Sequence, residues 1–420
     1  MSKYYFTRCP GNCQARVEKT FVLPDTFYHM HLYRASFLFF CKIFSVSRWL
    51  AALFYCGILM YMKNNPPVAS KKLNQIVEPL LLWYEKNARV LPWRENSEPY
   101  RVWLSEIMLQ QTRVEAVKPY YERFLAAFPN VAALACAPED RLLKLWEGLG
   151  YYSRVRNLQK AARQVVEEHD GALPGEYEQL KKLPGIGEYT AGAIASIAFH
   201  QRVPVVDGNV LRVISRIIGS RESIDASACK KRIWQELSQV VPAKCPGDFN
   251  QALMELGATV CLPGGRPLCA ACPLQTQCFA NLEDETGEIP VRDPKKEKKC
   301  EQRTVLLLWQ DGKVALRRRP SKGLLGGMWE FPSLEGYLSG AEVERQLRNM
   351  GIKSRKVERL PNSRHVFTHI IWEMIGYRAE LDACSPAAEL EFWSPRALRK
   401  EAAMPSAFAA YTALIREGEE

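Results

Sequence analysis

The chain has 420 residues, of which 47% are hydrophobic and 25% are charged, and its 57 basic and 46 acidic side chains give a formal charge of +11. This is a globular composition, so it excludes a wholly disordered chain, a collagen-like repeat and a multispanning membrane protein. The length predicts two or three domains with sizeable cores. The positive charge favours a polyanionic partner but does not bear on the fold.

The first 61 residues differ from the rest in being rich in Phe, Tyr, Leu and Cys. Their longest uncharged run, residues 49–62, is shorter than the roughly 20 residues of a membrane-spanning helix. We therefore treat residues 1–68 as an atypical leader with two open interpretations. It is either a targeting segment or sequence upstream of a true translation start at Met60 or Met62. The expected location is cytoplasmic and nucleoid-associated if the organism is bacterial, and the leader leaves targeting open.

Residues 69–290 are predicted to form a helical domain. Apolar side chains recur at three- and four-residue spacing, for example at Leu142, Leu145 and Trp146. Proline and glycine interrupt this pattern at short intervals, as they do between packed helices. The charged residues 291–303 predict a linker. Residues 304–420 begin with a strand–turn–strand pattern, which predicts a second, α+β domain.

A nine-residue segment, Leu-Pro-Gly-Ile-Gly-Glu-Tyr-Thr-Ala at 183–191, predicts a turn between two helices. Gly185 and Gly187 allow a tight turn and a close backbone approach. The helix that follows presents free N–H groups, which can hold a DNA phosphate without reading the base sequence. A lone Gly-x-Gly would fit an ordinary loop, but with these flanking residues the segment resembles the helix–hairpin–helix element of DNA repair proteins.

Two carboxylates stand out in their local sequence. Glu106 lies in the otherwise apolar helical stretch 103–109, where burial would raise its pKa and suit it to act as a general acid. Asp207 precedes a predicted helix, and we expect it at the N-cap, where backbone N–H groups stabilise the ionised form. One protonated and one ionised carboxylate suit acid-assisted cleavage of a glycosidic bond. From position alone, an exposed helical Glu and a purely structural cap are the alternatives.

Four of the 13 cysteines lie within 18 residues, namely Cys261, Cys269, Cys272 and Cys278. In a reducing compartment such a group indicates metal or iron–sulfur ligation rather than disulfides. Four thiolates suit zinc or a 4Fe-4S cluster, and the absence of two separated Cys-x-x-Cys pairs argues against zinc. We expect a structural rather than a redox role, and we expect the other nine cysteines to be thiols.

Taken together and in order, these motifs resemble those of the MutY-type adenine DNA glycosylases in the helix–hairpin–helix, endonuclease-III-like superfamily. The resemblance runs from about residue 69 to 420 and also includes residues 91–94, 105–112, 148–154 and 206–210. It implies a mainly α N-terminal glycosylase domain with a 4Fe-4S loop at 261–278, followed by an α+β MutT-like (Nudix-like) C-terminal domain. The implied reaction removes adenine mispaired with 8-oxoguanine, or with guanine, from duplex DNA and leaves an abasic site.

The resemblance implies a role for individual residues. Glu106 would protonate adenine N7, and Asp207 would stabilise an oxocarbenium ion, with Tyr189 and Asn209 supporting this chemistry. The target must leave the base stack, because an acid reaches it poorly in stacked DNA. The implied DNA contacts are Trp93, Arg94 and Gln251 around the extruded adenine, Gln111, Thr112 and Tyr151 within the duplex, and Gly185 and Gly187 in the hairpin.

Tyr189 also bears on the type of reaction. A glycosylase that also cleaves the DNA backbone needs a lysine amine to form a Schiff base with the sugar. In the endonuclease-III-type motif that lysine would occupy the position of Tyr189, and a phenol forms no imine. We therefore predict a monofunctional glycosylase.

The C-terminal domain is identified through residues 324–332, which resemble the characteristic stretch of the family's MutT-related module. The chain after them lacks the closely spaced acidic pairs that bind metal in nucleotide hydrolases, so we expect no nucleotide hydrolysis. Phe367, Thr368 and His369 match a loop that recognises 8-oxoguanine in the family, where Ser is usual in place of Thr368. A second departure is the seven residues between Cys261 and Cys269, where the family has six; the two glycines at 264–265 can accommodate one more.

Two rival functions stay open on the sequence. One is another glycosylase of the same superfamily, acting on mismatched thymine or oxidised pyrimidines, against which Tyr189 and the C-terminal domain argue. The other is a noncatalytic DNA-binding protein or iron–sulfur redox scaffold, against which Glu106 and Asp207 argue. The expected partner is double-stranded DNA carrying adenine opposite 8-oxoguanine, and we expect a monomer.

Overall fold

The computed structural model describes residues 68–264, 267–294, 297–382 and 389–415. Residues 1–67, on which the two interpretations of the leader depend, lie outside these ranges. Within them, no helix combines the length and the hydropathy that a membrane-spanning segment needs.

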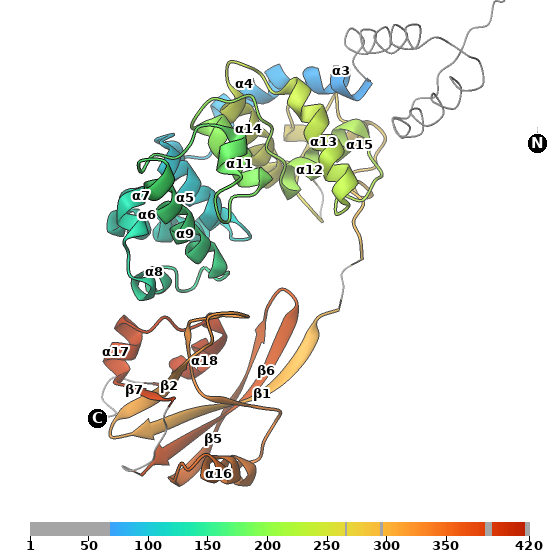
Figure 1. Ribbon diagram of the computed structural model, residues 1–420. Helices are drawn as coiled ribbons and strands as arrows, with labels where there is room; N and C mark the ends of the chain where they lie inside the picture. Colours follow the sequence, from blue (N-terminus) through green and yellow to red (C-terminus); the bar gives the residue numbers. More distant parts are fainter. Residues whose placement is uncertain (1–67, 265–266, 295–296, 383–388, 416–420) are drawn as a thin grey trace, which may run out of the picture. The chain divides into compact units, whose positions relative to one another are not determined.

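The first part of the described chain is helical (Figure 1). Its α-helices are α3 (Val68–Asn74), α4 (Val77–Asn87), α5 (Pro99–Leu109), α6 (Val114–Ala127), α7 (Val131–Ala135), α8 (Glu139–Leu145), α9 (Ser153–Glu168), α10 (Tyr177–Leu180), α11 (Glu188–Ile197), α12 (Gly208–Ile218), α13 (Ser227–Val240), α14 (Pro246–Thr259) and α15 (Phe279–Leu282). Two 3-10 turns, η1 (Pro92–Arg94) and η2 (Cys269–Ala271), complete it.

The helical part has two hydrophobic cores. One is built largely by α5, α6, α9 and α11, and the other by α4, α12, α13 and α14. Met254 on α14 packs against both cores. Glu106 lies on α5 and Asp207 immediately precedes α12. The two carboxylates therefore belong to segments that pack in different cores.

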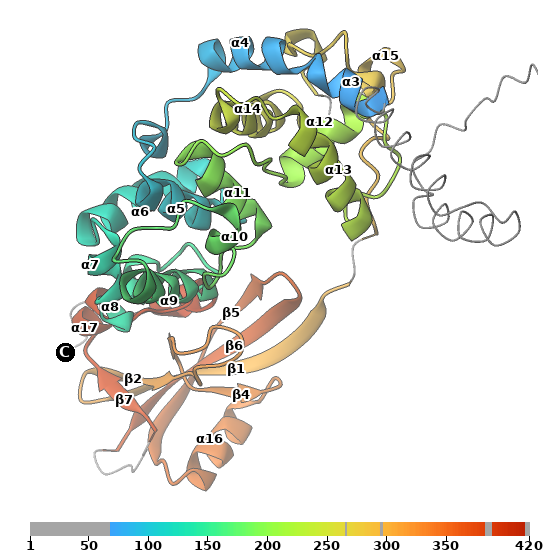
Figure 2. The same cartoon turned by 45° about the horizontal axis from the view of Figure 1, so that its top comes forward.

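The second part is built on a mixed sheet (Figure 2). Its strands are β1 (Lys299–Gln310), β2 (Lys313–Arg318), β3 (Trp329–Glu330), β4 (Ser333–Glu335), β5 (Ser354–Val366), β6 (Ile370–Leu381) and β7 (Glu391–Trp393). The main order is β3-β2-β1-β6-β5, with β4 on β1 and β7 on β2. Strands β1 and β6 are parallel, whereas β1–β2 and β5–β6 are antiparallel. Strand β1 begins at Lys299, within the segment 291–303 that the sequence suggests as a linker.

Side chains alternate between the two faces of this sheet, as the period of a strand requires. On one face, Val305 and Leu307 pack with residues of α17 (Pro395–Lys400), η3 (Ser406–Phe408) and α18 (Ala409–Thr412). On the other, Leu306 and Leu308 pack with Val343 and Leu347 of α16 (Gly340–Asn349). The observed architecture confirms the predicted fold class, a mainly α part followed by an α+β part.

Candidate active site

Glu106 lies in the middle of α5 and is only 6% exposed. The phenol of Tyr189, from the first turn of α11, donates a hydrogen bond of 2.7 Å to Glu106 Oε2. The same phenol oxygen lies 3.4 Å from Met254 Sδ. The prediction that Glu106 occupies apolar surroundings is therefore confirmed, and the alternative of an exposed helical Glu is wrong.

Asp207 is the N-cap of α12, as predicted. Its Oδ1 accepts a 2.7 Å hydrogen bond from the Val210 backbone N–H, and its Oδ2 accepts a 2.9 Å bond from Asn209 Nδ2. An N-cap carboxylate in this position satisfies one of the free N–H groups of the helix. Asn209 therefore contacts Asp207 directly, as a supporting role requires.

Burial raises the pKa of Glu106 from 4.5 to about 7, against the effect of the Tyr189 hydrogen bond. Burial raises the pKa of Asp207 as well, although its bonds from Val210 and Asn209 and the nearby Arg212 cation act in the opposite direction. The expectation that the two carboxylates shift in opposite directions is thus wrong for Asp207. The cap donors are present, but desolvation outweighs them.

Two arginines of α12 contact the cysteine loop, and one of them also contacts Asn209 beside Asp207; the sequence reasoning missed both. Arg212 Nη2 donates 2.9 Å to Asn209 Oδ1, and Arg212 Nε donates 2.8 Å to the Cys261 carbonyl. One turn later on α12, Arg216 Nη1 lies 3.2 Å from Cys261 Sγ. A signal for them existed, since two buried cations four residues apart on an apolar helix need acceptors on a neighbouring segment.

Trp93 and Arg94, predicted to line the adenine pocket, lie together in η1. Trp93 is 7% exposed and packs edge-on against Tyr121 at a ring-centroid distance of 5.5 Å. Gln251, the third predicted pocket residue, lies on α14 one turn before the fully buried Glu255.

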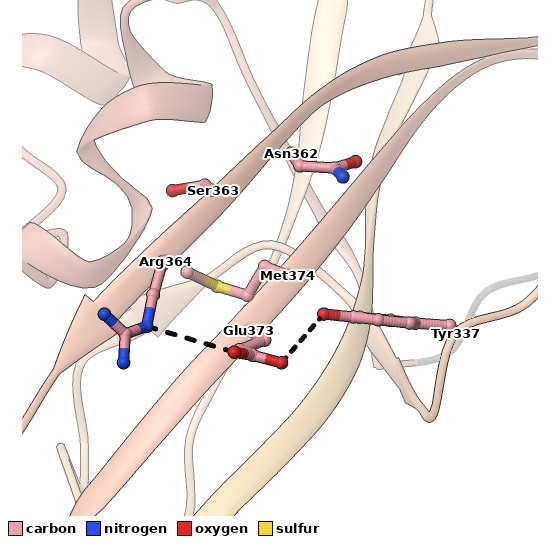
Figure 3. A pocket seen from close by; sticks show the side chains of 6 residues that line it. All are labelled: Tyr337, Asn362, Ser363, Arg364, Glu373 and Met374. Atoms are coloured by element: carbon pink, nitrogen blue, oxygen red, sulfur yellow. Dashed lines mark hydrogen bonds and ion pairs between the residues drawn. The ribbon is translucent and has the colours of Figure 1, made fainter.

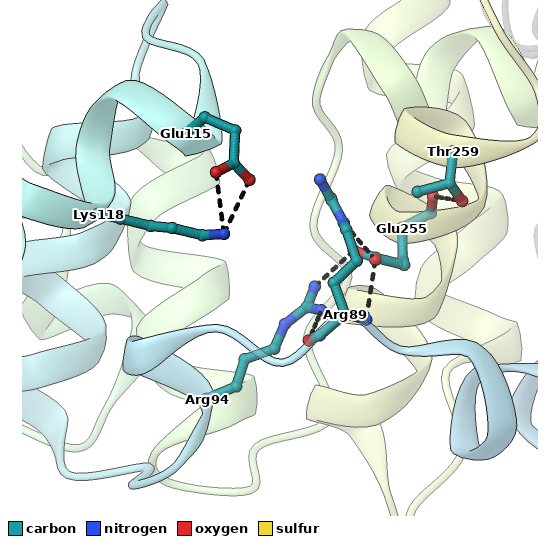
Figure 4. A network of polar contacts seen from close by, with 6 residues as sticks. All are labelled: Arg89, Arg94, Glu115, Lys118, Glu255 and Thr259. Carbon is teal, nitrogen blue, oxygen red and sulfur yellow. Dashed lines mark hydrogen bonds and ion pairs between the residues drawn. The ribbon is translucent and has the colours of Figure 1, made fainter.

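Glu255 anchors Arg94, and the sequence reasoning missed it (Figure 4). Arg94 Nη2 is 2.8 Å from Glu255 Oε2, and Arg89 Nε is 2.6 Å from Glu255 Oε1. These two cations hold the pKa of Glu255 below its ordinary value despite its burial. A buried carboxylate with two guanidinium partners is ionised and fixes the position of both arginines.

The hairpin is formed as predicted between α10 and α11. Gly185 has φ of +79°, and a Cβ at that position would lie 2.7 Å from the Asn157 Cβ, so the turn requires glycine there. Gly187 is the N-cap of α11, and a Cβ at Gly187 would meet nothing within 4 Å. The backbone at the start of α11 is therefore accessible on the side of Gly187.

The residues predicted to enter the duplex lie in two loops, one after α5 and one before α9. Gln111 and Tyr151 are exposed and have left-handed backbone conformations, with φ of 56° and 49°. Thr112 is half-buried beside Gln111. The Tyr151 phenol oxygen is 2.7 Å from the Thr368 hydroxyl, which brings together two residues 217 positions apart.

Phe367, Thr368 and His369 form the loop between β5 and β6. The Phe367 ring packs edge-on between His365 and Trp372, at centroid distances of 4.5 and 4.9 Å. Thr368 and His369 are exposed. The loop is thus anchored by one aromatic side chain and presents the other two residues to solvent.

The four clustered cysteines all line one small cavity together with Arg216. Cys269 begins η2, and Cys278 is the N-cap of α15. None of the cysteines in the described ranges forms a disulfide. No three thiols, imidazoles or carboxylates among the described residues are close enough to hold a single metal ion.

A second hollow lies on the sheet of the C-terminal part (Figure 3). Three of its polar side chains contact one another, since the Tyr337 hydroxyl donates a 3.3 Å hydrogen bond to Glu373 and Arg364 lies 3.9 Å from the same carboxylate. It is open to solvent and contains none of the predicted site residues.

Comparison with known proteins matches both parts of the chain. Residues 104–239 match the HhH-GPD superfamily of base excision DNA repair proteins, and residues 304–414 match a NUDIX domain. The adenine DNA glycosylase of Rattus norvegicus is 36% identical over 367 residues, covering 74% of this chain and 71% of the relative. The chain belongs to the adenine DNA glycosylase family.

Other members of the adenine DNA glycosylase family are similarly related. That of Buchnera aphidicola subsp. Acyrthosiphon pisum is 33% identical over 293 residues, covering 70% of this chain and 83% of the relative. A solved thermostable thymine-DNA glycosylase is 28% identical with a TM-score of 0.47, covering 51% of this chain and 98% of that chain. The predictions of the MutY-type family and of a DNA-binding DNA N-glycosylase in base excision repair are confirmed. The roles of individual site residues stay predictions.

Proposed function

We propose that this DNA glycosylase excises adenine paired with 8-oxoguanine, or with guanine, from duplex DNA and leaves an abasic site. The observation that carries the proposal is the carboxyl of Glu106, which is buried, has a pKa of about 7 and is hydrogen-bonded to Tyr189. A carboxyl that is substantially protonated near neutral pH can act as a general acid toward a base that is extruded into its site. The names of the relatives support adenine as that base.

The reaction begins when Glu106 donates its proton to adenine N7. Protonation turns adenine into a better leaving group, and the bond between the base and the sugar breaks with its electron pair going to the base. The sugar becomes an oxocarbenium ion, which the Asp207 carboxylate stabilises electrostatically. Water then adds to the sugar carbon, and its proton restores the Glu106 carboxyl.

Arg94 and Trp93 form the wall of the adenine site in this proposal. The ion pair of Arg94 with the buried Glu255 fixes its guanidinium before DNA binds. A donor fixed in this way loses little conformational freedom when the substrate arrives. Gln251, one turn before Glu255 on the same helix, supplies an adaptable amide for the edge of the base.

We propose that Cys261, Cys269, Cys272 and Cys278 hold a 4Fe-4S cluster. Their four side chains line one small cavity, and four thiolates are the ligand set of a 4Fe-4S cluster. When bound, the cluster supplies a covalent cross-link for the loop. The native protein should contain about four iron atoms per chain and absorb broadly in the blue. An iron-free preparation with an intact loop and full activity would contradict the assignment.

Recognition of 8-oxoguanine is assigned to Tyr151 and the loop that carries Thr368. Their 2.7 Å hydrogen bond supports a shared role, because it brings a duplex-entering loop to the β5–β6 loop. The aromatic ring of Tyr151 can stack in the duplex beside the lesion, while the hydroxyl of Thr368 can exchange its protein partner for a lesion group.

The substrate assignment is tested by single-turnover cleavage of three duplexes. They carry adenine opposite 8-oxoguanine, adenine opposite guanine, and thymine opposite guanine. We expect fast release of adenine from the first, slower release from the second and no release of thymine. Thymine release, or no release of adenine from either duplex, would overturn the proposal.

The pH dependence of excision follows from the two carboxyls. Glu106 acts in its protonated form, so the rate should fall as the pH rises through about 7, approaching tenfold per unit. Asp207 acts ionised, so the rate should also fall in acid, below a pKa that burial places above the ordinary 3.8. Initial rates measured with DNA well below saturation report the pKa values of these two groups in the free enzyme. A rate that is constant from pH 6 to 9 would contradict the role of Glu106.

A monofunctional reaction should leave no covalent enzyme–DNA intermediate. Tyr189 stands where a Schiff-base lysine would be needed, and its hydroxyl is engaged by Glu106. Borohydride added during adenine release should therefore trap only a trace of adduct. Abundant trapping, seen as a slower band on a denaturing gel, would show that another amine attacks the sugar.

A further inference from the structure

Arg154, in the first turn of α9, is buried and contacts two loops at once. It is 8% exposed. Its Nη1 donates to two carbonyls in the last turn of α5 and to the Gln110 carbonyl directly after that helix. Its Nη2 donates to Thr112 and to the loop before α9. The six acceptors are Ile107 O at 2.9 Å, Met108 O at 2.8 Å, Gln110 O at 2.6 Å, Thr112 Oγ1 at 3.2 Å, Leu149 O at 3.1 Å and Gly150 O at 3.0 Å.

These contacts are unusual for a buried cation because all six acceptors are neutral oxygens. Burial lowers the pKa of Arg154 to about 10, so the side chain is still charged near neutral pH. An arginine without a carboxylate partner in such a place is costly unless many dipoles are directed at it. The carbonyls at the end of α5 and in the loop before α9 supply these dipoles.

The two loops carry the residues that we expect to enter the duplex. Gln111 follows Gln110 directly, and Tyr151 follows Gly150 directly. Arg154 therefore hydrogen-bonds the backbone carbonyl immediately before each of them. Both have positive φ values, of 56° and 49°. This backbone conformation is unfavourable for a residue other than glycine, and it persists only where its surroundings enforce it.

The side chain of Tyr151 is positioned by the same group. The Arg154 guanidinium carbon lies 5.5 Å from the Tyr151 ring centroid and 5.3 Å from that of Trp146. One planar cation thus contacts the exposed Tyr151 ring, the buried Trp146 ring and the backbone of both loops. Trp146 in turn donates a 3.1 Å hydrogen bond to the Gly150 carbonyl.

We propose that Arg154 is a positioning residue that assembles the two loops, before DNA binds, into a single element that displaces the target base. The inference rests on the proposed base excision and adds a separate step to it. Arg154 contacts neither reacting carboxyl and acts through Gln111 and Tyr151. Its loss should therefore slow extrusion of the base and leave the chemistry of the extruded base unchanged.

The effect should depend on how firmly the target base is paired and stacked. Extrusion is unfavourable from a well-paired, stacked duplex and much less so where pairing is already disrupted. Two duplexes distinguish these cases, both with adenine opposite 8-oxoguanine. One has matched flanking pairs, and the other has a mismatch on each side of the lesion pair.

The experiment compares the full-length native chain with Arg154→Lys on both duplexes under single-turnover conditions. Lysine keeps the charge, but its one nitrogen cannot bridge both loops. We expect excision to slow by about 10- to 100-fold on the matched duplex and by less than about threefold on the disrupted one. A 2-aminopurine beside the target should show slower or weaker unstacking with Arg154→Lys.

Gln159→Met is the matched control for a purely structural effect. Gln159 is also buried on α9, at 6% exposure, and donates to two backbone carbonyls, Ala137 O at 2.6 Å and Leu134 O at 3.4 Å, which lie outside both loops. This variant should change the rates on both duplexes by the same factor. Arg154→Gln, which keeps two donors and no charge, provides a second test if Arg154→Lys does not fold.

If a folded Arg154 variant slows excision by the same factor on both duplexes, the inference about Arg154 is wrong and the proposed function still stands. A native chain that releases adenine from neither duplex would overturn the proposed function instead. In that case the 2-aminopurine signal still decides the role of Arg154, because unstacking does not require bond cleavage.

Discussion

Replacing Glu106 by glutamine is expected to slow adenine release by about 10²- to 10⁴-fold, while the affinity for duplex DNA with adenine opposite 8-oxoguanine changes little. Glutamine has nearly the same shape, and its carbonyl can still accept the hydrogen bond from Tyr189. It has no proton to donate to adenine N7. The measurement is a single-turnover excision rate together with a binding titration on the same duplex.

The stability of Glu106→Gln separates loss of chemistry from loss of structure. Glu106 has an ordinary pKa of 4.5 and a folded value of about 7, so the folded state becomes less stable as pH rises between these values. Above pH 7 the difference amounts to roughly 3 kcal/mol. Glutamine avoids this cost, so the variant should unfold at higher denaturant than the native chain at pH 8 and at similar denaturant near pH 4.5. A variant that is inactive and also less stable at pH 8 would contradict the role of a protonated acid.

Local pattern was sufficient to predict several features of the site. Glu106 lies in a mostly apolar stretch of one helix. Burial of that stretch therefore places its carboxyl group away from water. The cap at Asp207 and the turn at Gly185 also follow from short-range rules, since each depends on a few neighbouring backbone groups. These features are recognisable in sequence because the groups that determine them are close together along the chain.

The features that the sequence did not reveal depend on contacts between distant segments. Desolvation raises the pKa of Asp207 although its cap bonds act in the opposite direction, and a position at a helix start does not show how far a side chain is desolvated. Glu255 and Arg89 are 166 positions apart, and nothing near either one indicates its partner. Arg154 resembles any helical arginine until the two loops fold over it. The partners of these charges lie too far away along the chain for a local sequence pattern to identify them.

The positions of Glu106 and Asp207 suggest why the site needs both halves of the helical part. Glu106 lies on α5, which packs in one core with α11, and Asp207 caps α12, which packs in the other core with α14. Tyr189 and Met254 meet between these cores, at 3.4 Å, beside Glu106. Small changes in how the cores pack would therefore change the distance and the relative orientation of the two carboxyl groups, even with every helix intact.

Replacing Asp207 by asparagine should slow adenine release by about 10²- to 10³-fold, because it removes the negative charge that stabilises the oxocarbenium ion. Asparagine caps helices about as well as aspartate, so the bond from Val210 N–H can be kept. The excision rate should no longer fall on the acidic side of the pH profile, since the group that must be ionised is gone. The rate should still fall as the pH rises through about 7, because Glu106 is unchanged.

Asp248→Asn provides the matched control for the loss of one charge. Asp248 lies in the first turn of α14, so the substitution also removes a carboxylate from the start of a helix, but it touches neither Glu106 nor Asp207 in the proposed reaction. Its excision rate should stay within about twofold of the native rate, since a helix-end charge contributes about 0.3–1 kcal/mol to stability and nothing to this chemistry. If Asp207→Asn were as active as Asp248→Asn, Asp207 would be only a cap. The charge on the sugar would then have to be stabilised by a different group.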